Sequence, residues 1–410
     1  MNDSPEPQSN DREPLQRIPR RADDDYCPEA VAARLALARS VSQAPLEHLA
    51  GAPVDPGSAR GNIENLVGYA QVPVGLAGPL RLDGEQGVYE VYVPMATTEG
   101  AMVASYSRGM GVLREAGGAR ARMIASKLSQ HPMLVYRDAA AALHAAGIAA
   151  EMRAEFEAWV AGSSSVGRLV GLFPEVLGRR LVLRLEFATG DAVGINMAAR
   201  AAEHCSGRLA EQTGALECHV HGQDVEKRAN GRALVQPRGR SVVCDATLPA
   251  ELVRRRLRVE PADLAAIAAT YAVGYAQLGT QNWTVQAANG LGAIFLACGQ
   301  DVAYLTESAT GWLDLSVTAA GDLYAGVHLP NLLLGTVGGG SGQGTAAECL
   351  ALLGCAGAGR STRFAEILAG AVLAGDLSLM ASFCAGDFVA AHERLGRNRP
   401  AGSLDSGPSH

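Results

Sequence analysis

Four ionisable residues stand in settings where they could act on a reacting group: Glu99, Lys227, Asp301 and His392. Glu99 follows two threonines at a predicted helix start, where the helix dipole favours a carboxylate. Asp301 ends the apolar run 294–300, where a buried carboxylate is costly unless a cation pairs with it. Groups of these types supply proton transfer and stabilise a developing negative charge.

Each of these residues also has a plain structural interpretation. Glu99 could simply begin a helix, and Asp301 could form a structural ion pair. Lys227 and its neighbour Arg228 follow a polar loop and could be surface charges. His392 lies late in a predicted helix and could be a C-terminal cap. The four residues alone leave these alternatives open.

Two glycine-containing loops precede predicted helices. The loop 335–342 would let the backbone approach a ligand, and a following helix N-terminus attracts phosphate. It lacks the lysine of a P-loop and the spacing of a Rossmann fingerprint, so it indicates either a turn or a dinucleotide contact. In the loop 187–197, Asp191 either caps the next helix or contacts a cofactor amide or ribose.

The helices and strands that must position these residues are predicted from the periodicity of apolar residues and from the positions of glycine and proline. Strands are predicted at 87–94, 133–136, 180–185 and 240–244. Helices are predicted at 28–50, 97 onward, 147–160, 192–214, 262–298, 344–358 and 362–394. Strand–helix alternation between 132 and 221 predicts a compact α+β insert, and residues 1–25 are predicted to be disordered.

Composition excludes several classes of protein. The 410 residues are 48% hydrophobic and 19% charged, with a net charge of −7, so nucleic acid and anionic membranes are not expected partners. The arginine-rich run 254–258 indicates a solvated helix face, with an anion site as the alternative.

None of the eight cysteines forms a C-x-x-C pair, and no metal site is predicted. The polar N-terminus is unlike a signal peptide, and no window of about 18 residues is apolar without interruption, so a cytoplasmic protein is expected.

Several segments together resemble the hydroxymethylglutaryl-CoA reductase family. They run in the family's order between about 62 and 399 and include Glu64–Pro79, Met95–Ser105, Thr189–Met197, Ala293–Asp301, Gly335–Gly340 and Leu377–Met380, with His392 beyond. The form Thr97-Thr98-Glu99-Gly100 is similar to the family's class I, which usually prefers NADPH.

The resemblance assigns roles by position. It implies that Glu99 protonates the carbonyl oxygen, Lys227 stabilises the oxyanion, Asp301 links the two, and His392 protonates the departing thiolate. It implies substrate contacts at Arg228, Asn289, Ser105, Arg108, Gln130 and Thr270. It implies contacts with NADPH, or alternatively NADH, at Asp191, Val193, Asn196, Gly338, Gly339 and Gly340.

The implied fold is α+β, with a large domain around a long central helix at about 262–288. The expected parts are a disordered tail (1–27), a helical segment and linker (28–60), a discontinuous large domain (61–131 and 222–399), a small inserted ferredoxin-like cofactor domain (132–221) and a disordered tail (400–410). The implied assembly is a homodimer or homotetramer, in which Lys227 faces Glu99 across the subunit interface.

Departures from the family gather around the substrate and cofactor. Gln130 stands where the family usually has Arg, and Thr270 where it has Lys. Other departures are Ser107 for Asn, Gln286 for His, and Ser165-Val166 for Arg-Phe. Loss of two cations weakens binding of a substrate carboxylate. The resemblance implies four-electron reduction of an acyl thioester to an alcohol, as in hydroxymethylglutaryl-CoA to mevalonate. The alternatives are reduction of another CoA- or carrier-protein-bound thioester without that carboxylate, or a non-reducing, redox-neutral member of the family.

Overall fold

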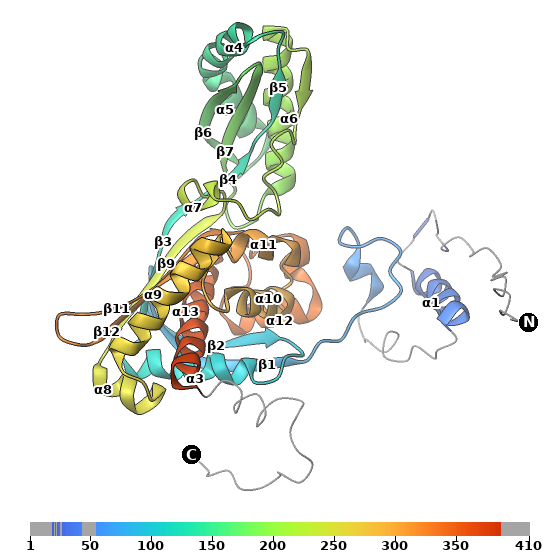
Figure 1. Ribbon diagram of the computed structural model, residues 1–410. Coiled ribbons are helices and arrows are strands. Elements are labelled where there is room, and N and C mark those ends of the chain that lie inside the picture. Colours follow the sequence, from blue (N-terminus) through green and yellow to red (C-terminus); the bar gives the residue numbers. More distant parts are fainter. Residues whose placement is uncertain (1–18, 20, 22, 25–26, 43–54, 387–410) are drawn as a thin grey trace, which may run out of the picture. The chain divides into compact units, whose positions relative to one another are not determined.

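The computed structural model describes residues 19, 21, 23–24, 27–42 and 55–386 (Figure 1). The chain divides into two compact units, one ending at Val72 and the other beginning at Pro73. His392, the tail 400–410 and most of the tail 1–27 lie outside the described residues. The first unit contains α1 (Pro28–Ser42) and the short η1 (Pro56–Ala59), so the predicted helix from 28 is confirmed as far as 42.

A seven-stranded mixed sheet forms the larger part of the second unit, in the order β10-β11-β12-β9-β3-β1-β2. Its strands are β1 (Val74–Gly84), β2 (Gly87–Ala96), β3 (Ala119–Ser126), β9 (Arg240–Leu248), β10 (Asn282–Trp283), β11 (Gly311–Val317) and β12 (Leu323–Leu332). The predicted strands at 87–94 and 240–244 are confirmed as β2 and β9. Most pairs are antiparallel; β1 with β3 and β10 with β11 are parallel.

The long core helix is α13 (Ser361–Ala385), which packs against α3 (Met102–Glu115) and against the sheet (Figure 1). Nearly every residue of α13 from Phe364 to Ser382 is buried, as expected for a helix that is apolar all round. Gly109 of α3 faces the backbone of Ala374, and a Cβ at Gly109 would lie 1.8 Å from that carbonyl oxygen. A glycine is therefore required for α3 to approach α13 this closely.

The long central helix expected at 262–288 is wrong in position. The apolar run is divided into α9 (Pro261–Leu278) and α10 (Ala287–Ala297), with β10 between them. Gly279 ends α9 with a left-handed φ of 66°, a common helix terminator. Much of α9 is exposed, and the central position belongs to α13. The helix predicted at 362–394 ends at Ala385, where Gly386 adopts a φ of 71°.

A second, five-stranded sheet has the order β4-β7-β5-β8, with β6 paired to β7. Its elements are β4 (Leu128–Gln130), β5 (Met133–Val135), β6 (Arg168–Leu177), β7 (Arg180–Ala188), β8 (Glu217–His219), α4 (Ala139–Glu151), α5 (Arg153–Ser163) and α6 (Ile195–Thr213). Figure 1 shows α4, α5 and α6 gathered around these strands. The predicted strands and the helix 192–214 are confirmed, whereas the helix predicted at 147–160 is two helices joined at Met152.

Short elements connect the strands and helices of the larger sheet. They are α7 (Arg232–Val235), α8 (Ala250–Leu252), η2 (Val253–Leu257), η3 (Val302–Tyr304), α11 (Leu305–Ser308), η4 (Gly339–Gly342) and α12 (Gly344–Leu352). The arginine-rich run begins in the π-helical turn η2, where Arg255 and Arg256 pair with Glu115. Both ion pairs are partly exposed, which agrees with the prediction that this run forms a solvated helix face.

One described helix, Ser361–Ala385, is long and apolar enough to cross a membrane by length and composition. Its most apolar window is 83% buried inside the protein. The apolar character of α13 is therefore accounted for by its place in the core.

Candidate active site

A cavity of about 500 Å³ brings together residues from four segments that are distant in the sequence. Its wall includes several predicted site residues, namely Lys227, Asp301, Val193, Asn196, Gly338, Gly339 and Gly340. Other wall residues are Glu226, Gln300, Tyr304, Gly335 and the start of α6. We refer to it below as the Lys227 cavity.

Lys227 and Asp301 form an ion pair at the edge of this cavity. The Lys227 Nζ lies 3.3 Å from the Asp301 Oδ2, and both side chains are about half exposed. The other oxygen of Asp301 accepts a hydrogen bond of 2.9 Å from the Ala303 N–H and so caps η3. The carboxylate is thus fixed by the backbone, and it holds the ammonium at a defined place on the cavity wall.

Tyr304 lies on the other side of the same ammonium. The Lys227 Nζ stands 5.0 Å from the centre of the Tyr304 ring, a cation–π distance. The Tyr304 hydroxyl donates a hydrogen bond to the Glu226 carboxylate. Burial and the neighbouring Glu226 raise the pKa of Tyr304 well above its usual value, so the phenol stays protonated.

The glycine loop forms the facing wall. Gly338 and Gly339 have φ values of 79° and 57°, and a Cβ at either would meet no atom within 4 Å. Gly340 packs against Gly299, where a Cβ on Gly340 would lie 2.6 Å from the Gly299 carbonyl oxygen. The glycines therefore serve left-handed turns and a close backbone approach, and they leave the backbone open to the cavity.

The start of α6 lies at the same cavity. Its N-cap residue is Gly194, with φ 82°, and no side chain of the described residues caps the helix. Ile195, Asn196 and Met197, the first residues of α6, line the cavity. Amide groups at an uncapped helix start favour an anion such as phosphate.

Asp191 caps a different helix from the one expected. Its carboxylate accepts hydrogen bonds from the N–H groups of Gly359 (2.7 Å) and Ser361 (3.1 Å), at the start of α13. Partial burial alone would raise the pKa of Asp191, but these bonds and the charge of Arg240 bring it below its ordinary value. The interpretation as a cap of its own helix is wrong, because the chain turns at Gly194 and carries the side chain toward α13.

Glu99 lines a separate cavity of about 410 Å³, together with Pro73, Val74, Thr97 and Val103. The prediction that Glu99 lies in the first turn of a helix is wrong, since α3 begins at Met102 after Ala101 at φ 68°. Instead, the Glu99 N–H donates to the Thr97 Oγ1 at 3.0 Å in an exposed loop. Glu99 and Lys227 line different cavities of one chain.

The six predicted substrate residues are dispersed. Arg228 pairs with Asp224, and Arg108 donates to Ser378, which also contacts Ser105. Asn289 and Thr270 are exposed, and the Thr270 hydroxyl donates to the Ala266 carbonyl. In the described part of the chain none of the six lines the Lys227 cavity.

Gln130 is the most unusual of the six. It is 3% exposed, and its Nε2 has no hydrogen-bond partner among the described residues. A buried amide without a partner is costly.

Sequence reasoning missed Glu226, Tyr304, Glu307 and Arg238. Tyr304 and Glu307 follow Asp301 by three and six residues, a spacing that repeats one face of a tight helix. A second overlooked signal concerns lysine itself. The chain has 35 Lys and Arg residues, but only Lys127 and Lys227 are lysines. Arg and Lys differ chemically, so a position that keeps lysine in an arginine-rich chain is informative.

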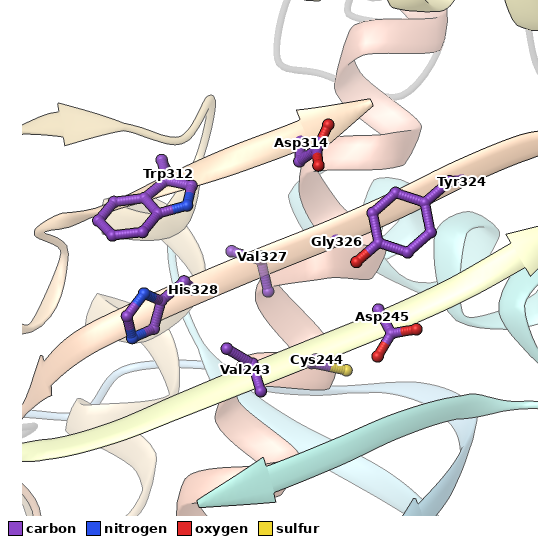
Figure 2. Close-up of a pocket in the computed structure, with 9 residues that line it drawn as sticks. All are labelled: Val243, Cys244, Asp245, Trp312, Asp314, Tyr324, Gly326, Val327 and His328. Atoms are coloured by element: carbon purple, nitrogen blue, oxygen red, sulfur yellow. The ribbon is translucent and has the colours of Figure 1, made fainter. Parts of the chain in front are cut away.

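A further concavity, of about 250 Å³, lies on the seven-stranded sheet and is lined by side chains of β9, β11 and β12, including Trp312, Asp245 and His328 (Figure 2). The His328 Nε2 lies 2.8 Å from the Ser241 Oγ, and the Trp312 ring meets the His328 ring edge to face. It contains no predicted site residue. The Lys227 cavity is therefore the candidate active site.

Comparison with known proteins identifies the family to which the chain belongs. The family model for hydroxymethylglutaryl-coenzyme A reductase matches residues 30–397. The chain is 39% identical over 364 residues to the 3-hydroxy-3-methylglutaryl-coenzyme A reductase of Pyrococcus abyssi, covering 86% of this chain and 89% of that protein. It is 38% identical over 373 residues to the enzyme of the same name from Methanothermobacter thermautotrophicus, covering 90% and 94%.

Solved structures show the same fold. The class II 3-hydroxy-3-methylglutaryl-CoA reductase of Streptococcus pneumoniae, bound to NADPH in open conformations, superposes with a TM-score of 0.67 at 20% identity. The match covers 86% of this chain and 96% of that one. The α+β fold is thereby confirmed. From the family model and the archaeal relatives together, this chain belongs to the hydroxymethylglutaryl-coenzyme A reductase family of oxidoreductases.

Proposed function

We propose that this protein reduces hydroxymethylglutaryl-CoA to mevalonate with two molecules of NADPH, and that the Lys227 cavity is where hydride transfer occurs. The observation that carries the proposal is the Lys227–Asp301 ion pair, which shares one cavity with the glycine loop 335–340. A lysine ammonium fixed at the wall of this cavity is suited to a reaction that places negative charge on oxygen.

The residues of the cavity fit a nicotinamide dinucleotide. The open backbone at Gly338 and Gly339 and the uncapped start of α6 favour its phosphates, with Val193 and Asn196 beside them. NADPH, when bound, supplies the hydride. Asp191 supports this site from outside the cavity by holding the start of α13.

Lys227 would stabilise the oxygen that becomes negative when the thioester carbonyl accepts hydride. Asp301 keeps the ammonium in place, so little reorganisation accompanies the reaction. Collapse of the resulting hemithioacetal expels the thiolate, and by position in the family His392 would protonate it. The second hydride transfer requires a proton on the alcohol oxygen, which Glu99 would donate.

We further propose that a homodimer, or a homotetramer built from it, forms the complete site. Glu99 lines a second cavity together with the exposed apolar side chain of Val74. A two-fold interface that contains both this surface and the Lys227 cavity would bring Glu99 of one subunit to Lys227 of the other. We expect a cytoplasmic enzyme.

The test is a steady-state assay with hydroxymethylglutaryl-CoA and NADPH. The expected result is oxidation of two NADPH per free CoA released, with mevalonate as product. A purified protein that binds neither NADPH nor NADH in a fluorescence titration would overturn the reductase proposal. Sedimentation of a fully active monomer would overturn the shared site.

A second candidate substrate, an acyl thioester without the terminal carboxylate, is favoured by Gln130 and Thr270. Both replace family cations, and the Gln130 Nε2 is buried without a partner among the described residues. A neutral amide recognises a carbonyl or hydroxyl better than a carboxylate. Comparison of kcat/KM for hydroxymethylglutaryl-CoA and for acyl-CoAs of similar length decides this. Turnover of hydroxymethylglutaryl-CoA at micromolar concentrations would exclude the second candidate.

A further inference from the structure

The short segment from Asp301 to Glu307 contacts two consecutive residues, Glu226 and Lys227. Asp301 pairs with the Lys227 ammonium, and Tyr304 contacts both the ammonium and the Glu226 carboxylate. Glu307, one turn further, accepts a hydrogen bond from the Lys227 backbone N–H at 2.5 Å. Residues 301, 304 and 307 share one face of η3 and α11, because three residues make about one turn there.

The backbone of Lys227 needs support of this kind. Its φ is 59°, in the left-handed region that residues with a Cβ rarely adopt. Lysine has no local side-chain hydrogen bond to stabilise that conformation, unlike Asn or Asp. The Glu307 carboxylate meets the N–H of this residue, so the contact acts on the unfavourable torsion itself.

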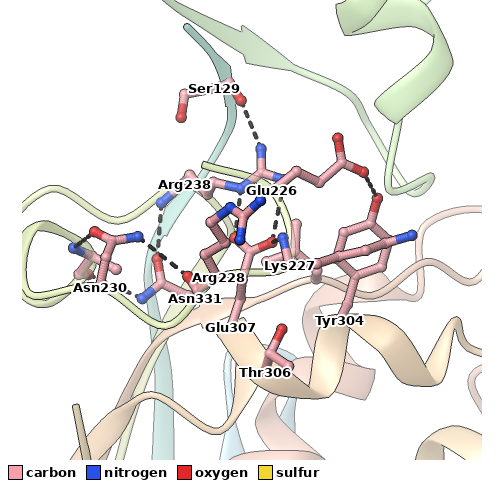
Figure 3. A network of polar contacts seen from close by, with 12 residues as sticks. Ser129, Glu226, Lys227, Arg228, Asn230, Arg238, Tyr304, Thr306, Glu307 and Asn331 are labelled. Carbon is pink, nitrogen blue, oxygen red and sulfur yellow. Dashed lines mark hydrogen bonds and ion pairs between the residues drawn. The ribbon is translucent and has the colours of Figure 1, made fainter. Parts of the chain in front are cut away.

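Glu307 is held by a buried partner. Its other oxygen accepts from the Arg238 Nε at 2.5 Å, and both side chains are at most 5% exposed (Figure 3). Arg238 also donates to the Ser129 carbonyl at 2.7 Å, and its backbone N–H donates to the Asn331 Oδ1 at 2.9 Å. The Glu307 carboxylate therefore has a fixed position, because β4 and β12 hold its partner Arg238.

We propose that Glu307 is a positioning residue for reduction: its carboxylate, paired with Arg238, fixes the backbone of Lys227 and so directs the ammonium toward Asp301 and the cavity. This inference rests on the proposed function for the role of Lys227. Glu307 itself touches neither substrate nor cofactor in this scheme.

Two double variants separate this role from the stability of the ion pair. Removing one partner of a buried pair leaves an uncompensated charge, whereas replacing both is often tolerated. Arg238→Met with Glu307→Gln removes the charges and keeps an acceptor for the Lys227 N–H. Arg238→Met with Glu307→Leu removes the charges and the acceptor. The two proteins differ only in whether residue 307 can hold Lys227.

The expected result is a loss of kcat by about 10- to 100-fold in the Leu version, as for a misplacement of about 1 Å, with recovery in the Gln version. The KM for NADPH should change by less than about twofold, because the glycine loop is untouched. Equal kcat in the two folded double variants would overturn the proposal.

Amine labelling gives a readout that does not depend on turnover. Since Lys127 and Lys227 are the only lysines, acetylation followed by peptide mass spectrometry reports Lys227 with Lys127 as internal reference. The ratio should change at least about threefold between the Leu and Gln versions, since an amine's reactivity follows its surroundings. An unchanged ratio would also overturn the proposal. If the unmodified protein lacks reductase activity while the labelling ratio still differs between the Leu and Gln versions, only the proposed function is overturned.

If both double variants fail to fold, hydrogen exchange on the unmodified protein decides. The Lys227 amide should exchange at least about tenfold more slowly than the amides of exposed Arg228 and Ala229, because it is hydrogen bonded to a buried carboxylate. Exchange as fast as at those neighbours would show that Glu307 does not hold Lys227.

Discussion

The Lys227 ammonium and the Asp301 carboxylate, 74 positions apart in the sequence (227 and 301), meet at 3.3 Å on the wall of one cavity. The pair is about half exposed, so it adds little to the stability of the fold. Its value lies in the defined direction that it gives to a positive charge.

Replacing Lys227 with arginine should abolish most of the reductase activity. A guanidinium spreads its charge over a plane and cannot reproduce the compact ammonium between Asp301 and Tyr304. We expect kcat to fall by about 100-fold or more, as for the loss of an oxyanion donor. Lys127→Arg is the matched control, because Lys127 pairs with Glu186, neither residue lines the Lys227 cavity, and arginine can keep that pair. Equal activity of the two variants would argue against a catalytic Lys227.

Asp301→Asn should lower kcat with little effect on unfolding. Asparagine keeps the cap on the Ala303 N–H but loses the charge that holds Lys227. A fall in kcat of about 10-fold or more is expected, with a melting temperature within about 2 °C of the unmodified protein. Asp301→Ala, which loses the cap as well, should be less stable. A D301N protein with normal kcat would contradict the role of the pair.

Mixed assemblies test whether two chains share the site. Glu99→Gln and Lys227→Met should each be inactive alone, whereas dimers that contain one chain of each variant should keep one intact site of two, about half of the sites. The measurement is specific activity after purification through two different tags. No recovery in verified mixed dimers would place both residues in one chain's site.

A methyl group at Gly109 should disrupt the contact between α3 and α13. A Cβ there would lie 1.8 Å from the Ala374 oxygen, so Gly109→Ala should destabilise the fold by about 3 kcal/mol or more. Gly111→Ala, on the same helix, meets nothing nearer than the Arg256 guanidinium at 3.7 Å and should stabilise it by about 0.5–1 kcal/mol. Denaturant unfolding of both variants checks the sign of each change.

Asp376 should make stability fall with rising pH. It is fully buried in α13, and burial raises its pKa to about 7, despite hydrogen bonds from the N–H groups of Gln286 and Val285. The folded state therefore prefers the protonated acid. The contribution of protonated Asp376 to the free energy of unfolding is fully present below pH 4 and is lost as the pH rises through 7.

The variant Asp376→Asn removes that dependence. Its unfolding free energy minus that of the unmodified protein should rise between pH 4 and pH 8, by on the order of 4 kcal/mol. Asp314→Asn, on exposed β11, serves as the control. Parallel stability curves for Asp376→Asn and the unmodified protein would contradict the prediction.

The sequence predicted β2, β5, β7 and β9, because short runs rich in Val, Leu and Tyr are a local signal, but it did not predict β1, β3, β6, β11 or β12. It misplaced the central helix, since both 261–278 and 361–385 are apolar and only packing decides which is buried. Arg238 could not be found from spacing, because an isolated guanidinium looks like a surface charge until the fold pairs it with Glu307. Asp191 was misassigned for the same reason, since its partner is 170 residues away.

The contact between Asp191 and the start of α13 links the stability of that helix to ligand binding in the Lys227 cavity. Asp191 precedes the cavity residue Ala192, and its carboxylate accepts hydrogen bonds from the backbone at the start of α13, which packs against the seven-stranded sheet. A ligand that orders residues 192–197 should therefore also reduce fraying at the start of α13. We therefore expect ligand binding to raise the melting temperature and to slow amide exchange at Ser361, which does not itself line the cavity.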